Sequence, residues 1–476
     1  MTAIYASLGS LPIELVYRIL DNLDDLTIVM SLRNVCSRLN LIIDTYHRYQ
    51  TLTMLNIANL RWKTQGLPCL YNLLLNNTIL VTLDLSYNRI GDEGTWFLAN
   101  ALKNNKVLIS LNLAKNDIGF NGAQYLADAL RENTTLGAIV LEFNNIGSQG
   151  TEYLVHALNH NRSLNILNLR QNKISADGVK YLSQALQNNE TLKTLVFDLN
   201  HIGQQGTQYL ADGLENNKAL TTIQLGYNAI GVEGTKLLSN ALQKNTTLST
   251  LALEVNHIGY EGVKYLANAL EKNKTLAVLN LRWNQIGNQG AQYLANALQN
   301  NTMLTTLNIM MNDIDSKGVK HLTDALQNNK TLMTLYFGGN KIGLLGAQFL
   351  ADLLKTNTAI TELMLEGDGL GDRGTQYLAN ALENNNTLIA LNLQENGVSD
   401  EGAHCLANAL KINAKLEVLN LSRNKIRFPG LLNLVNALKY NTTLMILNLQ
   451  SNSIDDDQVV RQLANNLGKD ANRVFW

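Results

Sequence analysis

The sequence predicts an α/β solenoid in which short parallel strands line a concave face and helices cover the convex face. Three observations support this class. An asparagine recurs every 28 residues, as in Asn88 and Asn116. Leucines alternate ahead of each asparagine, which indicates a short strand with one buried face. Beyond a glycine-bearing turn, apolar residues follow at helical spacing, such as Leu98, Ala101 and Leu102.

The repeating unit, TLxxLxLxxNxIGxxGxxxLAxALxxN, cannot fold alone, because its few buried side chains do not offset the backbone entropy of the whole unit. Neighbouring units must therefore stack and share one core. Strands stack about 4.8 Å apart, whereas packed helices need about 8–10 Å. Because this difference bends the stack, the sequence predicts a horseshoe with its strands inside.

Each repeated position has a structural role. The asparagine both donates and accepts hydrogen bonds, so it can bond the backbone groups of the turning chain. Gly91 and Gly94 allow a tight turn and a close approach before the helix. The pattern breaks between Gly338 and Gly369, where Asp368 replaces the asparagine and a buried hydrogen bond is expected to be lost. Two interpretations remain open there: a notch for a partner's protrusion, or simple divergence.

Composition argues against several function classes. The 38 basic residues balance 39 acidic ones, so no net field attracts nucleic acid or a membrane surface. Cys36, Cys69 and Cys405 lie far apart, which indicates a reduced intracellular protein. The N-terminus lacks the positive cluster of a signal peptide, and repeated sequons such as Asn133-Thr134-Thr135 are interpreted as part of the structural repeat. We therefore expect a cytoplasmic or nuclear protein.

No motif in the chain predicts chemistry. His156 and His160 stand four residues apart, which is metal-ligand spacing on a helix, but no third ligand accompanies them. A phosphate-binding loop and a serine elbow are both missing from the sequence. We therefore predict no enzyme activity, no catalytic residue, no cofactor and no metal.

The repeat resembles the ribonuclease-inhibitor-type leucine-rich repeat over residues 80–468. A degenerate capping copy is expected over residues 52–79 and a C-terminal tail over residues 469–476. The resemblance implies a horseshoe that binds protein on its concave face. Related arrays also occur in intracellular immune receptors and in Ran-type GTPase-activating proteins. For the latter, the only early-loop arginine is Arg89, in an ordinary consensus turn.

Side chains that point into the hollow form the candidate partner-binding surface. Alternate residues of a strand face the same side. We therefore take the candidates from the positions one and two residues before each asparagine. In the middle of the array, opposed charges frame apolar and aromatic anchors. Alternatively, the charges pair across neighbouring strands after duplication of a two-repeat unit. The surface comprises Glu142, Phe143, Arg170, Asp198, Leu199, Tyr227, Glu254, Val255, Arg282, Trp283, Met310 and Met311.

The segment ahead of the repeats, residues 8–48, is unlike the rest of the chain. Ser10 is placed to cap a helix that has Pro12 in its first turn, and two further helices fit the residues that follow. Such a segment can shield the apolar end of a solenoid. Its pattern LPxELxxxIL, followed by LRNVCSRLNxII, resembles an F-box.

The F-box resemblance implies a three-helix segment that binds the small adaptor of SCF-type cullin–RING ubiquitin ligases. The chain would then be the substrate receptor of such a ligase, holding an unknown protein substrate on its concave face. The alternative is a free-standing repeat scaffold or inhibitor. The expected adaptor-binding side chains are Leu11, Pro12, Leu15, Ile19, Leu20 and Leu26.

Overall fold

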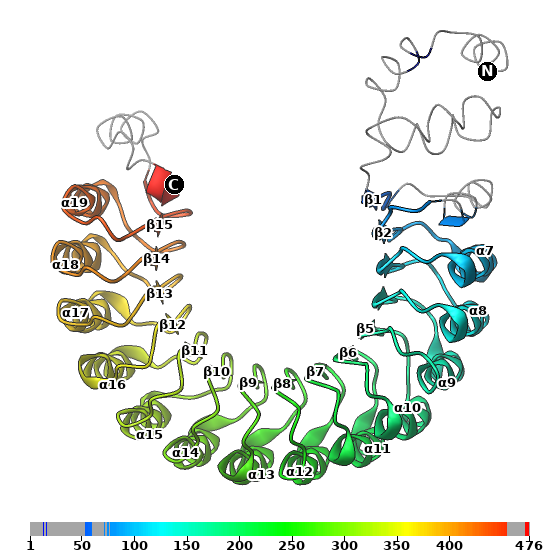
Figure 1. Ribbon diagram of the computed structural model, residues 1–476. Helices are drawn as coiled ribbons and strands as arrows, with labels where there is room; N and C mark the ends of the chain where they lie inside the picture. Colours follow the sequence, from blue (N-terminus) through cyan, green and yellow to red (C-terminus); the bar gives the residue numbers. More distant parts are fainter. Residues whose placement is uncertain are drawn as a thin grey trace. The chain divides into compact units, whose positions relative to one another are not determined.

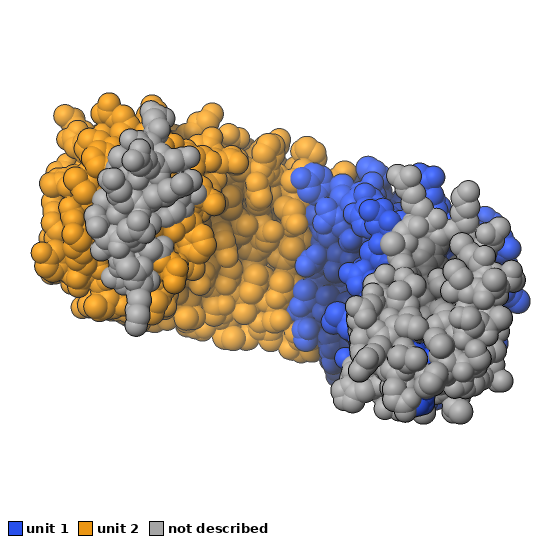
Figure 2. Space-filling model, turned by 90° about the horizontal axis from the view of Figure 1, so that it is seen from above, with its two compact units in different colours: residues 1–228 blue, residues 229–476 orange. Residues whose placement is uncertain are grey.

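A computed structural model of the chain describes residues 13, 16, 53–59, 71, 74, 75, 77–454 and 472–475. The chain divides into two units, Met1–Asn228 and Ala229–Trp476 (Figure 2). Of the predicted F-box-like segment, only Ile13 and Val16 are described. The six adaptor-binding candidates lie outside the described residues, so their role stays a prediction.

In each unit, three-residue strands alternate with helices (Figure 1). The first unit contains β1 (Met54–Asn56), β2 (Thr82–Asp84), α7 (Gly91–Asn104), β3 (Ser110–Asn112), α8 (Phe120–Glu132), β4 (Ala138–Val140), α9 (Gly147–Leu158), β5 (Ile166–Asn168), α10 (Ala176–Asn188), β6 (Thr194–Val196), α11 (Gly203–Asn216) and β7 (Thr222–Gln224).

The second unit shows the same alternation up to β15 (Ile446–Asn448). It contains α12 (Gly231–Leu242), β8 (Thr250–Ala252), α13 (Gly259–Lys272), β9 (Val278–Asn280), α14 (Gly287–Leu298), β10 (Thr306–Asn308), α15 (Ser316–Leu326), β11 (Thr334–Tyr336), α16 (Gly343–Thr356), β12 (Glu362–Met364), α17 (Gly371–Leu382), β13 (Ala390–Asn392), α18 (Asp400–Leu410), β14 (Val418–Asn420), α19 (Phe428–Leu438), β15 (Ile446–Asn448) and β16 (Val474–Phe475).

Within each unit the strands pair in parallel and in chain order. The register follows the repeat, so Leu307 of β10 pairs with Leu335 of β11. The central residue of each strand is buried against the helices, whereas its two neighbours face the other side. The strands line the concave side of each unit and the helices its convex side (Figure 1). The predicted α/β solenoid is confirmed.

The helices meet the strands through a narrow apolar stripe. In α7 this stripe is Leu98, Ala101 and Leu102, all buried. Alanine in its centre allows the helix to approach the strand layer closely. The same three positions are buried in α14, as Leu294, Ala297 and Leu298. The core of each unit is therefore one layer of apolar side chains, mostly leucine and alanine, between strands and helices.

The recurring asparagine bonds the backbone of two repeats at once. The Asn116 side-chain oxygen accepts hydrogen bonds from the backbone amides of Asn88 (3.0 Å) and Ile90 (3.3 Å). Its Nδ2 donates to the carbonyl oxygens of Leu85 (2.9 Å) and Ala114 (3.2 Å). Because the side chain is fully buried, these bonds satisfy groups that water cannot reach. The predicted role of this asparagine is confirmed.

A second asparagine series follows each helix and contains the sequons. The Nδ2 of Asn133 donates to the carbonyl oxygens of Leu102 (2.7 Å) and Asn105 (3.0 Å). Its side-chain oxygen accepts from the backbone amide of Leu136 at 2.7 Å. The side-chain nitrogen of Asn133, where a glycan would be attached, is therefore buried and hydrogen-bonded. The interpretation of the Asn-Thr-Thr motif as a structural repeat is confirmed at this position.

Two types of junction lead from the turn into the helix. Most of the described helices begin at a glycine with positive φ, as at Gly91 and Gly147. Five helices instead have an extended residue at the N-cap: Gly119, Ser175, Asp315, Ser399 and Arg427. Each of these five amides donates to a side chain of the preceding repeat, in order Asp92, Ser148, Asn288, Asp372 and Asp400. The turn role predicted for Gly91 therefore does not extend to these five junctions.

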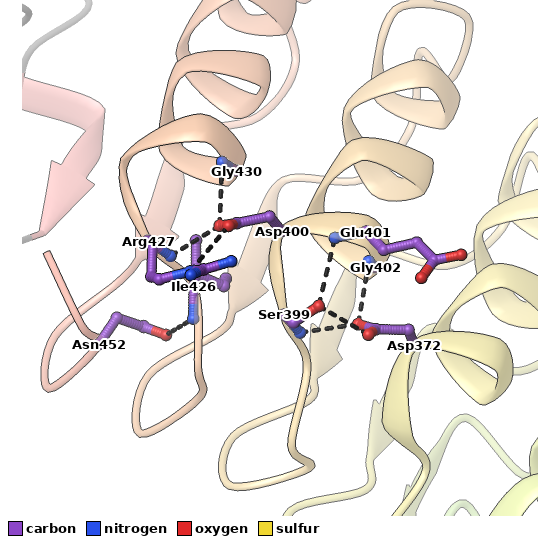
Figure 3. Close-up of polar contacts among 9 residues, drawn as sticks. All are labelled: Asp372, Ser399, Asp400, Glu401, Gly402, Ile426, Arg427, Gly430 and Asn452. Atoms are coloured by element: carbon purple, nitrogen blue, oxygen red, sulfur yellow. Dashed lines mark hydrogen bonds and ion pairs between the residues drawn. The ribbon is translucent and has the colours of Figure 1, made fainter.

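Asp372 and Asp400 show this inter-repeat capping most completely (Figure 3). One oxygen of Asp372 accepts from the backbone amides of Ser399 (2.7 Å) and Gly402 (3.0 Å). Asp400, in the next repeat, accepts from the amides of Arg427 (2.7 Å) and Gly430 (3.1 Å). Each carboxylate thus satisfies two donors at the start of the following helix, where negative charge is also favourable.

The ends of the array were predicted as a degenerate repeat and a tail. In the first, β1 pairs with β2, and Leu55, Ile57 and Leu74 are buried. Its other expected positions, Leu60 to Leu70, lie outside the described residues. At the C-terminus, Val474 and Phe475 form β16, which pairs with β15. No helix among the described residues is long and apolar enough to cross a membrane.

Candidate protein-binding surface

One row of side chains on the concave side is held by an unusual backbone conformation. The asparagines that recur every 28 residues, such as Asn88 and Asn284, are called the ladder asparagines here. The residue before each of them has a positive φ, for example Tyr87 at 60° and Trp283 at 59°. Residues other than glycine rarely adopt this backbone conformation. Here the amide of Tyr87 donates to the carbonyl oxygen of Ala114 (2.9 Å), and that of Trp283 to Met310 (3.1 Å). The repeat therefore imposes the conformation whatever residue occupies it.

Large side chains in this row are exposed. Tyr87 and Tyr227 of the first unit are 51% and 47% exposed, and Trp283 of the second is 54% exposed. Phe143 and Leu199 are half-buried. Exposed rings on a rigid backbone are typical anchors of protein interfaces, because little entropy is lost when they bind.

Two predicted surface residues, Asp198 and Met310, lie inside. They are only 2% and 8% exposed. The Asp198 carboxylate accepts a hydrogen bond from the backbone amide of Gly226 at 2.6 Å. For Asp198, the residue at the same position of the next repeat is Gly226, whose amide the carboxylate reaches. Burial raises the pKa of Asp198 above its ordinary value, while the Gly226 amide and the nearby Arg170 charge oppose that rise.

The predicted charge pattern is built from hydrogen bonds with amides. Glu142 accepts a hydrogen bond from Nδ2 of Asn168 at 3.1 Å, and Glu254 accepts one from Asn280 at 3.1 Å. Across the described residues, no ion pair within 4.0 Å joins Arg170 to an acid. The Nε of Arg170 is buried without a hydrogen-bond partner in the described part of the chain. Direct pairing across strands therefore does not account for Arg170.

The second unit combines apolar and charged side chains. Arg282, Trp283 and Met311 are exposed, and Val255 is half-buried. The Met311 side chain extends over Gly339, where an added Cβ would clash with its sulfur. The concave side of this unit therefore presents a small apolar patch made by Trp283 and Met311.

The glycine-rich break in the repeat is occupied by side chains of the chain itself. A Cβ added at Gly338 would lie 2.7 Å from the Cδ, Cγ and carbonyl oxygen of Glu366. Glu366 in turn accepts from Nδ2 of Asn392 at 3.2 Å. Burial raises the pKa of Glu366. Gly338 and Gly339 thus make room for Glu366 and Met311, while Gly369 is exposed with nothing close to its missing Cβ.

The histidine pair does not form a larger cluster. His156 lies 4.0 Å from Glu152, a residue of the same helix α9. No group of three or more histidine, cysteine, aspartate or glutamate residues suited to a metal occurs among the described residues. Reasoning from the sequence missed the inter-repeat caps, whose shared feature is a small polar residue four positions after the recurring asparagine or, for Asp372, after Asp368.

A comparison with protein-family models agrees with this architecture. Ten segments match the family model described as Leucine Rich repeat: residues 76–95, 104–127, 160–183, 244–267, 272–295, 300–322, 328–351, 384–407, 413–435 and 440–457. Together with the α/β stacking, these matches define the fold as a leucine-rich-repeat solenoid. Solenoids of this kind offer extended concave surfaces for binding.

Two solved structures are similar to the chain. The crystal structure of the Rad7 and Elc1 complex in yeast matches with 16% identity, a TM-score of 0.48 and coverage of 83% of this chain and 86% of that chain. Leiomodin-1 Actin-Binding Site 2 matches with 20% identity, a TM-score of 0.27 and coverage of 37% and 86%. At these identities and TM-scores, neither likeness carries an argument about this chain. No curated protein matches the chain in sequence.

Proposed function

We propose that this chain is the substrate receptor of an SCF-type cullin–RING ubiquitin ligase. In this proposal the concave side of the repeats holds a protein substrate, and residues 8–48 bind the adaptor of the ligase. The chain itself contributes binding and no chemistry, since ubiquitin would be delivered by the other subunits.

The substrate-binding half is supported mainly by the exposed rings of Tyr87, Tyr227 and Trp283. Large exposed rings on a protein surface are typical of sites that a partner covers. Their backbone amides are bonded within the sheet turns, so the rings are positioned before any partner arrives.

The adaptor-binding half is supported by the sequence pattern LPxELxxxIL, with Leu11, Pro12 and Leu15 as its leading apolar residues. An F-box presents such side chains to the adaptor on a helical face. If the segment only capped the repeats, the same side chains would be sealed against the first repeat, and no adaptor would bind.

A pull-down with purified adaptor and cullin subunits tests this proposal. The wild-type full chain should retain both, and the double variant Leu11→Asp/Pro12→Ala should lose both while keeping its circular dichroism spectrum. Ile412→Asp, a matched change at an exposed apolar residue of the repeats, should retain them. Failure of the wild-type chain to retain the adaptor would contradict the ligase role and favour a free-standing binding scaffold or inhibitor.

A further inference from the structure

A groove crosses the first repeats where the strands turn into loops. It has a volume of about 400 Å³ and lies entirely within the first unit. Its lining comes from the left-handed residues and the loop residues beyond the ladder asparagines. The lining residues are Asn59, Tyr87, Arg89, Lys115, Asp117 and Phe143.

A cation lies between two aromatic rings in this groove. The Nζ of Lys115 is 4.6 Å from the centre of the Tyr87 ring and 5.0 Å from that of Phe143. The guanidinium carbon of Arg170 lies 5.9 Å from the centre of the same Phe143 ring. Cation–π contacts at these distances hold the charges over the rings. Tyr87, Lys115, Phe143 and Arg170, which come from four successive repeats, therefore form a continuous cationic and aromatic strip.

The cations of this strip and of the groove lining form no close ion pair within the described part of the chain. Among the residues that the structure describes, no carboxylate lies within 4.0 Å of Arg89, Lys115 or Arg170. The buried Nε of Arg170 also has no hydrogen-bond partner there.

The neighbouring acids do not neutralise these cations directly. Glu142 is engaged by the side-chain amide of Asn168, and Asp198 is buried and bonded to the backbone amide of Gly226. Asp117 lines the groove and opposes an incoming anion, but it is outnumbered there by Arg89 and Lys115. The groove therefore offers two positive side chains beside two ring surfaces.

We propose that this groove binds an acidic peptide segment of a protein partner. A glutamate or aspartate carboxylate would pair with Lys115 or Arg89, and a second acid would pair with the guanidinium of Arg170 beside the Phe143 ring. Apolar side chains of the same segment would pack on Tyr87 and Phe143. This inference rests on the proposed function, since it names the kind of substrate segment that the concave side would hold.

A protein partner fits the groove better than a nucleic acid does. Rings beside cations also occur in single-strand binding sites, which track a phosphate backbone with a run of positive charge. Here Asp117 sits within the lining, Glu142 is next to Phe143, and the whole chain carries a net charge of −1. Such a surface suits a few separated carboxylates more than a continuous polyanion.

Fluorescence anisotropy with the full chain tests this inference. The probes are short labelled peptides that alternate leucine with glutamate, glutamine or lysine, and a labelled oligouridylate of similar length. The glutamate peptide should bind best, and its affinity should fall as salt rises. Lys115→Glu and Arg170→Gln should each weaken it by about tenfold, whereas Asp117→Asn should strengthen it.

Lys180→Glu provides the matched control, because Lys180 is exposed on helix α10 of the same unit, away from the groove. This variant should bind the glutamate peptide like wild type. Equal binding of all three peptides, equal weakening by Lys180→Glu, no binding by wild type, or tighter binding of the oligouridylate would overturn the inference. Adaptor capture by Lys115→Glu is measured in parallel and should be unchanged. Loss of peptide binding with intact adaptor capture therefore separates this inference from the ligase role.

Discussion

The carboxylate of Asp368 accepts a hydrogen bond from the backbone amide of Asn340 at 2.8 Å, in the place where other repeats hold an asparagine. The same oxygen accepts from the amide of Lys341 at 3.1 Å. Its second oxygen is buried without a partner in the described part of the chain. Asparagine uses its Nδ2 there, as Asn396 does toward the carbonyl oxygen of Leu365 at 2.6 Å. The loss of a buried bond predicted at Asp368 is therefore seen as this unpaired oxygen.

We predict that Asp368→Asn stabilises the chain, and more so at high pH. Burial raises the pKa of Asp368 to about 8 from 3.8. The folded chain thus keeps a proton that the unfolded chain releases, so the favourable contribution is complete below the unfolded pKa and is lost as the pH rises through 8. The slope is about 1.4 kcal/mol per pH unit for one proton. Urea denaturation should show a larger gain near pH 8 than near pH 5.

The reverse change supplies the control. Asn284 occupies the same ladder position and is fully buried, with its Nδ2 donating to Leu253 at 2.8 Å. Asn284→Asp should destabilise the chain and introduce the pH dependence that Asp368→Asn removes. An equal gain from Asp368→Asn at both pH values would show that Asp368 is ionised in the folded chain.

Gly339→Ala should lower the midpoint of thermal unfolding. Gly339 has a φ of 74°, and its added Cβ would meet the sulfur of Met311. Gly369 has a similar φ of 68° with nothing within 4 Å of its missing Cβ. Gly369→Ala should therefore cost about 1 kcal/mol of backbone strain, and Gly339→Ala about 1–3 kcal/mol more from overpacking. Equal losses would mean that Met311 moves aside freely, which Met311→Ala in the Gly339→Ala background would reveal.

Asp372→Ala should open the start of helix α18. The variant leaves the amides of Ser399 and Gly402 without their acceptor, which typically costs about 1 kcal/mol at a helix N-terminus. Hydrogen exchange at these amides should become faster, while exchange at the start of α16 stays unchanged. Asp352→Ala removes an exposed pair with Lys355 and should have almost no effect. Unchanged exchange at Ser399 would show that the cap contributes nothing.

Trp283→Ala and Tyr227→Ala should abolish capture of the protein partner without loss of thermal stability. Both rings are exposed, so their removal leaves no cavity in the core. Tyr440→Ala, which alters an exposed tyrosine after helix α19, should capture the partner normally. Affinity purification followed by mass spectrometry, together with a thermal melt of each variant, measures both properties. A large fall in melting temperature would identify the rings as packed structure.

The repeated residue pattern predicts most of the fold, because each repeated position has a local structural role. The alternation of leucine in each strand, the stripe of Leu98, Ala101 and Leu102, and the bonding role of the asparagine are all found in the structure. The junction at Gly119 could not be read from its own repeat. The same letter, glycine, has positive φ at Gly91 and extended backbone at Gly119, because Asp92 of the preceding repeat caps the latter.

The candidate surface could be predicted only in part, since period alone assigns a side chain to a face and not to a depth. Trp283 and Tyr227 are exposed as expected, whereas Asp198 and Met310 are buried. The missing information is the residue one repeat later. At Asp198 that residue is Gly226, and the carboxylate turns inward to accept from its amide. Whether the exposed residues bind a partner stays a prediction.

The left-handed positions ahead of the ladder asparagines carry one more consequence. Tyrosine, lysine, glutamine, tryptophan and glutamate all occupy them with φ close to 55°, because the hydrogen bonds of the turn, and not the residue, determine the backbone. A single substitution there changes the side chain on the concave surface without changing the backbone beneath it. Such an array can acquire a new client rapidly during evolution.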